Sequence, residues 1–282
     1  MRVIAPGKLV LTGAYAVLDG APAIVAAVDR YAIAERGSAS VDVRALHDEG
    51  GRKLGLGSSA ASLVASLGAK ALARGEDPRV AGVRAQIFRA ARAAHAREQG
   101  GGSGVDIAAS VFGGVLRYAV GSNAPAMRPV ELPGEVVLVA YWSGTSARTS
   151  DLRERVDAFR AKRSGGSLFG RLCELAESAA TSVGAGEAQA FVGFAAAFGR
   201  ALDALGKAAD APIVLPAFAE LASLAEGEDA AFLPSGAGGG DVAIWLGTAP
   251  PSAAFDRRAR TLSLRPLTLS IDRGGVRPES LS

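Results

Sequence analysis

The sequence predicts an α+β fold in which helices come in blocks and do not alternate one by one with strands. Short apolar runs typical of strands cluster near the beginning of the chain and recur near residues 230–246. Long segments with apolar residues at helical spacing fill the regions between them. Because strands and helices alternate regularly in parallel α/β sheets, this grouping favours a two-layer α+β architecture.

The beginning of the chain is predicted to be mostly strand. Two strands are expected around the turn Pro6-Gly7-Lys8, because glycine and proline interrupt the apolar pattern there. A short helical or turn segment is expected within Gly13–Gly20. The predicted strands are Arg2–Ala5, Leu9–Leu11, Ala23–Val28, Tyr31–Glu35 and Ser40–Arg44.

Helical periodicity dominates the next region. Pro78 stands near the start of one helical pattern. Proline is tolerated there because a backbone N–H in the first turn has no partner inside the helix. The predicted helices are Ser59–Arg74, Pro78–Arg97 and Val105–Phe112, followed by a strand at Val115–Ala119.

The pattern restarts near Leu132-Pro133-Gly134, which predicts a domain boundary with residues 1–134 on one side and 135–282 on the other. Helices are expected at Asp151–Lys162, Ser167–Ser182, Glu187–Ala208, Leu215–Ala225 and Ser252–Thr261. Strands are expected at Val136–Tyr141, Ala230–Leu233, Val242–Leu246 and Leu264–Ile271.

The composition is that of a globular protein. The chain has 282 residues, 49% of them hydrophobic and 21% charged, which is enough for one large or two ordinary domains. A net charge of +3 is too small to argue for a nucleic-acid partner but suits an anionic small substrate. No stretch reaches the length of a membrane span and no signal-peptide pattern is present, so a cytoplasmic protein without a membrane partner is expected.

Cysteine and histidine are scarce. Cys173 is the single cysteine, which excludes an internal disulfide and suits a reducing compartment, and we expect it to be buried on a helix face. The only histidines are His47 and His95, so a metal site built from histidines is not expected. We interpret His95 as a residue of a polar helix face.

The stretch Gly55-Leu56-Gly57-Ser58-Ser59-Ala60-Ala61 stands at the start of a predicted helix. Glycines let the backbone turn with its N–H groups facing inward. A helix N-terminus adds unpaired donors and the positive end of the helix dipole, so it binds phosphate readily. A Walker A loop is excluded because its Gly-Lys-Ser/Thr ending is missing. Taken alone, the stretch is equally consistent with a turn that only caps a core helix.

Two further glycine clusters, Gly100 to Asp106 and Ser235 to Asp241, both end in aspartate and precede apolar runs. Flexible linkers have a similar composition, but they are not followed at once by tightly patterned apolar segments. Three such clusters in one chain therefore indicate loops that approach a polyphosphate and its substrate closely.

Basic side chains accompany these loops. Lys8 lies in a turn beside glycine, from which its point charge can reach a phosphate. Lys53 directly precedes the first glycine loop, and Arg148 lies in a hydroxyl-rich loop that can contact a phosphate or a carboxylate. Alternatively, Lys8 is a solvated surface amine and Lys53 is only the polar end of the loop. The loop with Arg148 is alternatively a capped turn before the next helix.

With these motifs together, the sequence resembles the GHMP kinase superfamily. The family's N-terminal basic turn corresponds to Ala5-Pro6-Gly7-Lys8, its Gly-Leu-Gly-Ser-Ser loop to Gly55 through Ala61, and its C-terminal glycine-rich loop to Ser235 through Asp241. The matches keep the family's order and span nearly the whole chain. Within the superfamily, the sequence is most similar to phosphomevalonate kinases. The stretches that support this similarity are Gly13 through Leu18, Ala27 through Tyr31, Lys53, Gly102 through Ser110, and Trp142-Ser143-Gly144.

The resemblance implies the two-domain GHMP kinase fold, with an N-terminal ribosomal-protein-S5-like domain and a C-terminal ferredoxin-like α/β-plait domain. It implies ATP-dependent phosphorylation of 5-phosphomevalonate to 5-diphosphomevalonate in the mevalonate route to isoprenoids. ATP and Mg²⁺ are the implied cofactors, and a small phosphorylated molecule is the implied partner. A monomer or homodimer is expected.

The resemblance also implies roles for individual residues. Lys8 is expected over the transferring phosphoryl group, and Asp106 is expected to orient the acceptor phosphate or to hold Lys8 and the metal. The hydroxyl of Ser59 or Ser58 would help to hold Mg²⁺. The residues expected to hold the ATP phosphates are Gly55, Leu56, Gly57, Ser58, Ser59 and Ala60. Substrate contacts are expected from Lys53, Ser103, Gly104, Arg148, Ser235, Gly236, Ala237, Gly238 and Gly239, with Gly236–Gly240 closing the site.

Some residues depart from the family pattern. Ala14 stands where members commonly carry glutamate, the connection before Gly55 is short, and no second carboxylate for Mg²⁺ is evident. Mevalonate kinases usually carry a glutamate where this chain has His95. The alternatives are a mevalonate kinase or another small-molecule GHMP kinase, and a catalytically silent nucleotide- or metabolite-binding regulator on the same fold.

Overall fold

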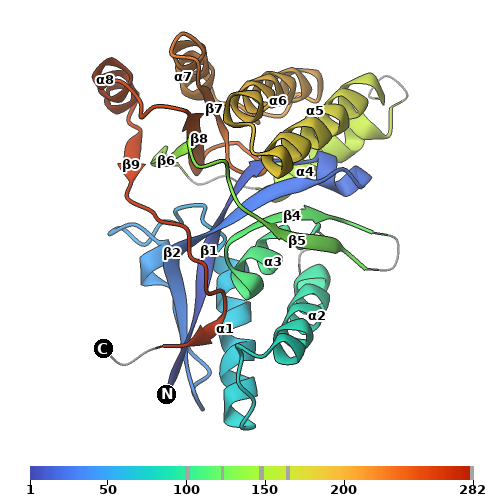
Figure 1. Ribbon diagram of the computed structural model, residues 1–282, viewed down its shortest axis with the longest axis vertical. Coiled ribbons are helices and arrows are strands. Elements are labelled where there is room, and N and C mark those ends of the chain that lie inside the picture. Colours follow the sequence, from blue (N-terminus) through green and yellow to red (C-terminus); the bar gives the residue numbers. More distant parts are fainter. Residues whose placement is uncertain (99–101, 122–123, 146–148, 163–165, 280–282) are drawn as a thin grey trace. The chain divides into compact units, whose positions relative to one another are not determined.

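A computed structural model describes residues 1–98, 102–121, 124–145, 149–162 and 166–279 (Figure 1). The chain divides into two compact units. The first comprises Met1–Leu9, Val25–Tyr118 and Leu269–Ser282, and the second comprises Val10–Ile24 and Ala119–Thr268. Each unit draws on separated stretches of the chain, so the boundary near residue 134 stays a prediction. The mixture of helices and strands confirms the α+β class.

The first two strands of the first unit are longer than the sequence predicts, whereas the strand expected at Ser40–Arg44 is only Val41–Asp42. The strands of this unit are β1 (Arg2–Thr12), β2 (Ala23–Glu35), β3 (Val41–Asp42), β4 (Val115–Ala119) and β10 (Arg277–Pro278). In the sheet, β10, β1, β2 and β4 are neighbours in that order, and β3 pairs with β2. The chain passes into the second unit along β1 and returns along β2.

The predicted breaks in β1 and β2 are wrong. At Pro6-Gly7-Lys8 no turn forms, because the Lys8 N–H donates to the carbonyl of Leu56 at 2.9 Å and the strand continues. In β2, Asp29 is held by the C-terminal segment: its N–H donates to the Ser270 carbonyl at 3.0 Å, and its carboxylate accepts from the Ser270 N–H. These partners lie far away in sequence, and for this reason local patterns do not predict them.

Helices α1 (Ser58–Ala73), α2 (Ala81–Glu98) and α3 (Val105–Phe112) lie together beside the strands of the first unit (Figure 1). Helix α1 approaches β1 at Gly68, where a Cβ would lie 2.8 Å from Val3. Helices α2 and α3 meet through Phe88 and Phe112, whose ring centroids are 5.5 Å apart. The predicted bounds of α3 and β4 are confirmed, whereas α2 begins after Pro78. A 3-10 turn, η2, spans Arg44–Leu46.

The end of the chain is fastened to the first unit by a buried carboxylate. Asp272 accepts hydrogen bonds from the N–H groups of Gly274 and Gly275, from the Arg277 guanidinium and from the Tyr31 hydroxyl. Burial by itself favours the neutral acid, but the hydrogen bonds from Arg277 and Tyr31 lower the pKa of Asp272 below its usual value. The predicted strand Leu264–Ile271 is therefore wrong beyond its first residues, because this part of the chain turns toward Asp272 instead of continuing a strand.

The second unit contains an antiparallel sheet with the strand order β7-β8-β6-β9. Helices α6 and α7 pack against β7, and α6 also reaches β8. The strands of this sheet are β6 (Val137–Trp142), β7 (Ala231–Pro234), β8 (Val242–Gly247) and β9 (Arg265–Leu267). Strand β5 (Ala126–Val130) falls in the same unit but is not part of this sheet. The helices are η1 (Ala16–Asp19), α4 (Thr149–Arg160), α5 (Gly166–Ala185), α6 (Ala188–Ala208), α7 (Pro216–Glu226) and α8 (Ala253–Thr261). Strand β5 was not predicted.

Aromatic side chains form the core of this second sheet. Phe232 contacts the rings of Tyr141, Phe218 and Phe255, and Trp245 packs edge-on against Phe255 at 4.6 Å. Such pairs add specific geometry to the burial of large apolar surfaces. In the described part of the chain, no helix is long and apolar enough to span a membrane. Cys173 on α5 is half-buried and not fully buried as expected.

Candidate functional site

The segment of β1 around Lys8 and the first glycine loop lie against each other in the first unit. The Lys8 ammonium donates to the Gly55 carbonyl at 3.3 Å, and the Lys8 N–H donates to the Leu56 carbonyl. A Cβ on Gly57 would stand 3.0 Å from Lys8 Cγ. A Cβ on Gly7 would stand 2.8 Å from the Leu56 carbonyl oxygen, so glycine is needed for the strand to approach the loop. Residues 47 positions apart are thus brought together.

The N-terminus of α1 has no side-chain cap. Its N-cap is Gly57, which has φ 77° and provides no side chain to accept from the first-turn N–H groups. Those N–H groups have no partner inside the helix, and the helix dipole adds positive potential at this end. Ser58 is buried, whereas Ser59 is exposed. The loop can therefore hold a phosphate by its backbone, with Lys8 beside it as a point charge.

The side chains present fit a magnesium ion that arrives with a nucleotide. Among the described residues, no group of three or more His, Cys, Asp and Glu side chains is arranged to hold a metal ion. Mg²⁺ keeps several waters and is commonly bound by few protein ligands together with substrate phosphates. An exposed hydroxyl such as that of Ser59 suits this mode, and a dedicated protein cage is not required.

The second glycine cluster leads into α3, also in the first unit. Gly104 is the N-cap of α3 with φ 77°. The Ser103 carbonyl accepts a hydrogen bond from the hydroxyl of Tyr118. Asp106 lies in the first turn, where its Oδ1 accepts from the N–H of Ile107 at 2.9 Å. A carboxylate at this end of a helix is stabilised by the dipole. Residues 99–101, which include the first glycines of the cluster, lie outside the described part of the chain.

The interpretation of His95 as a polar-face residue is wrong. Its side chain is only 9% exposed, and its Nε2 lies 3.7 Å from Oδ2 of Asp106. The sequence contained a signal for this burial: His95 stands four residues after Ala91 and eight after Ile87, both of which are buried on α2. No local sequence pattern predicts the pairing of His95 with Asp106, because it depends on how α3 packs back against α2.

The third glycine loop belongs to the second unit and is fastened at several points. The N–H of Val10 donates to Oγ of Ser235 at 2.9 Å, and the hydroxyl of Tyr15 donates to the Ala237 carbonyl at 2.7 Å. The N–H of Gly239 donates to the Ile213 carbonyl at 2.9 Å. Burial and, to a smaller extent, the charge of Asp157 raise the pKa of Tyr15 above its usual value, so its hydroxyl stays a donor. Sequence reasoning did not identify Val10, Tyr15 and Ile213 as supports of this loop.

The remaining predicted substrate residues are placed differently. Lys53 is exposed and pairs through its backbone with His47 in an isolated bridge just before the first glycine loop. Arg148 lies outside the described residues. Gly236 and Gly238 adopt positive φ values of 102° and 79°. The structure thus groups Lys8 with Gly55–Ser59, and Ser103–Asp106 with Tyr118 and His95, within the first unit.

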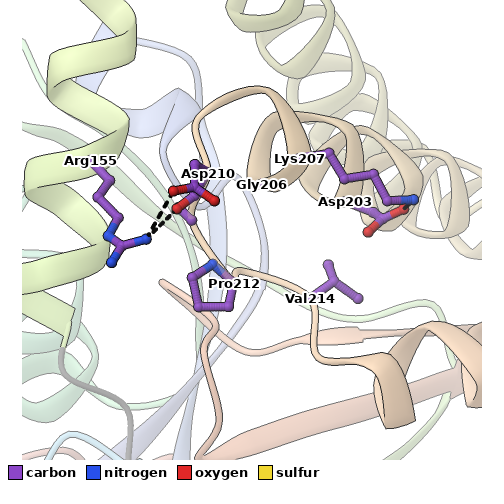
Figure 2. A pocket seen from close by; sticks show the side chains of 8 residues that line it. Arg155, Asp203, Gly206, Lys207, Asp210, Pro212 and Val214 are labelled. Atoms are coloured by element: carbon purple, nitrogen blue, oxygen red, sulfur yellow. Dashed lines mark hydrogen bonds and ion pairs between the residues drawn. The ribbon is translucent and has the colours of Figure 1, made fainter.

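A cavity of about 420 Å³ in the second unit is distinct from all of these residues. It is lined by α4, α6 and the segment after α6, and Figure 2 shows Arg155 directed at Asp210 and Lys207 at Asp203. Each of these cations is therefore compensated by a neighbouring carboxylate. Pro212 and Val214 also line the cavity. Paired charges on an open surface give no indication of a ligand, and none of the predicted site residues that the structure describes lines this cavity.

Comparison with known proteins gives consistent results. No protein-family model matches the sequence. A curated relative, the phosphomevalonate kinase of Streptomyces sp. (strain CL190), is 27% identical over 363 residues, covering 94% of this chain and 96% of the relative. That alignment is longer than the 282 residues of this chain, so the relative contains segments that are absent here.

Solved structures share the fold. A Lin0012 protein from Listeria innocua matches with a TM-score of 0.84 and 22% identity, covering 98% of both chains. The Streptococcus pneumoniae phosphomevalonate kinase in complex with phosphomevalonate and AMPPNP matches with a TM-score of 0.79 and 18% identity, covering 96% of this chain and 99% of that chain. These structures confirm the expected fold, and the curated relative confirms the resemblance inferred from the motifs.

Proposed function

We propose that this chain, which has the α+β fold of the GHMP kinases and resembles phosphomevalonate kinase along most of its length, is an ATP-dependent kinase that phosphorylates 5-phosphomevalonate. The observation that carries the proposal is the contact of Lys8 with the Gly55–Gly57 loop at the uncapped start of α1. This arrangement combines a point charge with free backbone donors. It supplies the charge neutralisation that transfer between phosphates requires.

In this proposal the first-turn N–H groups of α1 bind the phosphates of ATP, and Lys8 stabilises the negative charge that develops on the transferred phosphoryl group. The Ser59 hydroxyl helps to hold Mg²⁺, which supplies further positive charge when the nucleotide is bound. Asp106 orients the acceptor from the first turn of α3. The acceptor's phosphate is largely ionised near neutral pH, since its second pKa is about 6. A strong general base is therefore not required.

Ser103 and Gly104 remain candidate contacts for the acceptor, and Lys53 and Arg148 remain candidate contacts for its charged groups. In the second unit, the loop Ser235–Gly239 remains a candidate for substrate binding. Its glycines adopt positive φ values, which also occur in the backbone turns that bind anions. We infer a protein that acts in the cytoplasm on a small phosphorylated molecule.

The direct test is a coupled assay of ADP release with phosphomevalonate, mevalonate and homoserine as acceptors. We expect ADP release with phosphomevalonate and only background with the two alcohols, and Asp106→Asn should remove most of the signal. Turnover of mevalonate alone would refute the proposal and would identify the chain as a mevalonate kinase. Nucleotide binding without turnover of any acceptor would instead favour a silent regulator.

A further inference from the structure

The last turns of α2 bring two basic side chains to the segment that contains Asp106. Helices α2 and α3 pack side by side in opposite directions, since Phe88 meets Phe112 at one end and His95 meets Asp106 at the other. Arg92 and His95 are three residues apart, so they lie on neighbouring turns of the same helix face. Both therefore point toward residues 103–106.

His95 carries an unusual polar atom. The imidazole is 9% exposed, its Nε2 faces Asp106, and its Nδ1 is buried without a hydrogen-bond partner among the described residues. Buried polar atoms are nearly always paired, so an unpaired one requires an explanation such as a catalytic role or a missing ligand. A leucine or methionine would fill the same space without this cost. The position is therefore better explained by its contact with Asp106 than by packing.

Arg92 covers the start of the same segment. Its Cγ and Cδ would lie 3.4 Å from a Cβ on Gly104, so its stem runs directly over this glycine. Burial raises the pKa of the Tyr118 hydroxyl to about 12, and Arg92 and Asp106 act on that hydroxyl in opposite directions. Arg92 and Asp106, which carry opposite charges, thus both lie close enough to the Tyr118 hydroxyl to influence it. Within the described chain, the guanidinium pairs with no carboxylate.

We propose that this face of α2 forms one wall of the acceptor site, in which Arg92 binds the anionic group of the acceptor and His95 positions the carboxylate of Asp106. The inference rests on the proposed function and specifies its acceptor site. A planar guanidinium matches the oxygens of a phosphate, and the glycine at 104 lets the stem of Arg92 pack closely over the start of α3. The 3.7 Å separation between His95 and Asp106 is longer than a hydrogen bond, and such contacts tighten when substrate binds.

Arg92 is tested by comparing Arg92→Gln and Arg92→Lys with Arg89→Gln, which removes an exposed arginine from the same helix one turn earlier. We expect Arg92→Gln to raise KM for the acceptor about tenfold, with KM for ATP unchanged, because one charge-assisted hydrogen bond is lost. Arg92→Lys should recover part of the loss and Arg89→Gln should behave as wild type. Equal acceptor KM values for wild type and Arg92→Gln would overturn the role of Arg92.

A binding measurement separates this inference from the proposed function. Inorganic phosphate is titrated by calorimetry into wild type and Arg92→Gln, each saturated with AMPPNP so that the nucleotide loop is occupied. We expect weak phosphate binding to wild type and an affinity about tenfold lower in the variant. This holds even if phosphomevalonate is not the acceptor that wild type turns over. Absence of binding to wild type, or equal binding to both proteins, would refute the anion site.

His95 is tested with His95→Gln, which keeps a donor close to the position of Nε2, and His95→Leu, which removes it. We expect His95→Leu to lower kcat about tenfold with KM for the acceptor little changed, and His95→Gln to restore most of kcat. Thermal melting of both variants shows whether folding is intact. Equal loss in two folded variants, or no loss in either, would contradict a positioning role.

Discussion

The first and third glycine loops have similar compositions but are built in opposite ways. The loop Gly55–Ser59 leaves the first turn of α1 without a side-chain cap, and the side chain of Lys8 lies against it. The loop Ser235–Gly240 is fastened by Val10, Tyr15 and Ile213. The first loop therefore keeps its donors available for a ligand, whereas the third uses much of its hydrogen-bonding capacity to hold its own shape.

Glycine is required in both loops, but for different physical reasons. At Gly57 the backbone has φ 77°, and a Cβ would meet the flexible stem of a lysine at 3.0 Å. At Gly238 a Cβ would lie 2.1 Å from the carbonyl oxygen of Ile213, which is rigid backbone. Substitutions in the first loop should therefore change kinetics, and substitutions in the third loop should change stability.

The largest effect is expected for Lys8→Met. Removing the charge beside the first loop should lower kcat on the order of 10²–10³-fold, because one preorganised contact to developing negative charge is lost. Thermal stability should change little. Lys70→Met, at an exposed lysine on α1, is the matched control and should retain wild-type kinetics. Full activity of Lys8→Met in a steady-state ADP-release assay would show that Lys8 has no role in phosphoryl transfer.

The next effect is on folding. Gly238→Ala should reduce the free energy of unfolding by about 3 kcal/mol, from overpacking against Ile213 together with left-handed strain. Gly186→Ala shares the positive φ, 76°, but has no atom within 4 Å of the added Cβ, so about 1 kcal/mol is expected from strain alone. Denaturant unfolding followed by circular dichroism measures both. Equal losses would mean that the close approach to Ile213 contributes nothing.

Gly57→Ala should act mainly on nucleotide binding. We expect KM for ATP to rise about tenfold, because the added methyl meets Lys8 and the strained loop shifts its donors. Gly51→Ala has the same φ of 77° and open space around the new methyl group, so it should leave KM for ATP unchanged. A KM for ATP in Gly57→Ala no higher than in Gly51→Ala would mean that the contact with Lys8 does not affect nucleotide binding.

The smallest effect is expected for Tyr15→Phe. This change removes the donor to the Ala237 carbonyl and should cost about 1 kcal/mol of unfolding free energy. KM for ATP should stay constant, because the first loop is untouched. Chemical denaturation and ATP saturation curves on the same preparation check both statements. A change in KM for ATP without a change in stability would reverse the assignment of roles to the two loops.

The sequence predicted the elements whose signals are local. Helix α3 and strand β4 appear at the predicted bounds, because left-handed glycines end one element and begin the next. The first glycine loop and Lys8 were also singled out from local signals, because each belongs to a short motif. The continuous strands β1 and β2 were missed, since their partners Leu56 and Ser270 are distant in sequence.

Contacts between remote residues account for the rest of what was missed. The hydrogen bond from the Tyr15 hydroxyl to the Ala237 carbonyl joins residues 222 positions apart, and no local sequence pattern predicts it. His95 was misassigned because a histidine among arginines resembles a polar face, although its spacing from Ala91 indicated burial. Short motifs could therefore be recognised in the sequence, whereas the contacts that orient their side chains required the folded chain.

The central claim is that the acceptor is a phosphate and not an alcohol, and phosphorus NMR of the reaction products tests it most directly. With ATP, Mg²⁺ and phosphomevalonate, we predict loss of the phosphomonoester signal and growth of a pair of coupled diphosphate resonances as ADP accumulates. With mevalonate, no new phosphomonoester should form. A new phosphomonoester from mevalonate, together with an unchanged phosphomevalonate signal, would contradict the account.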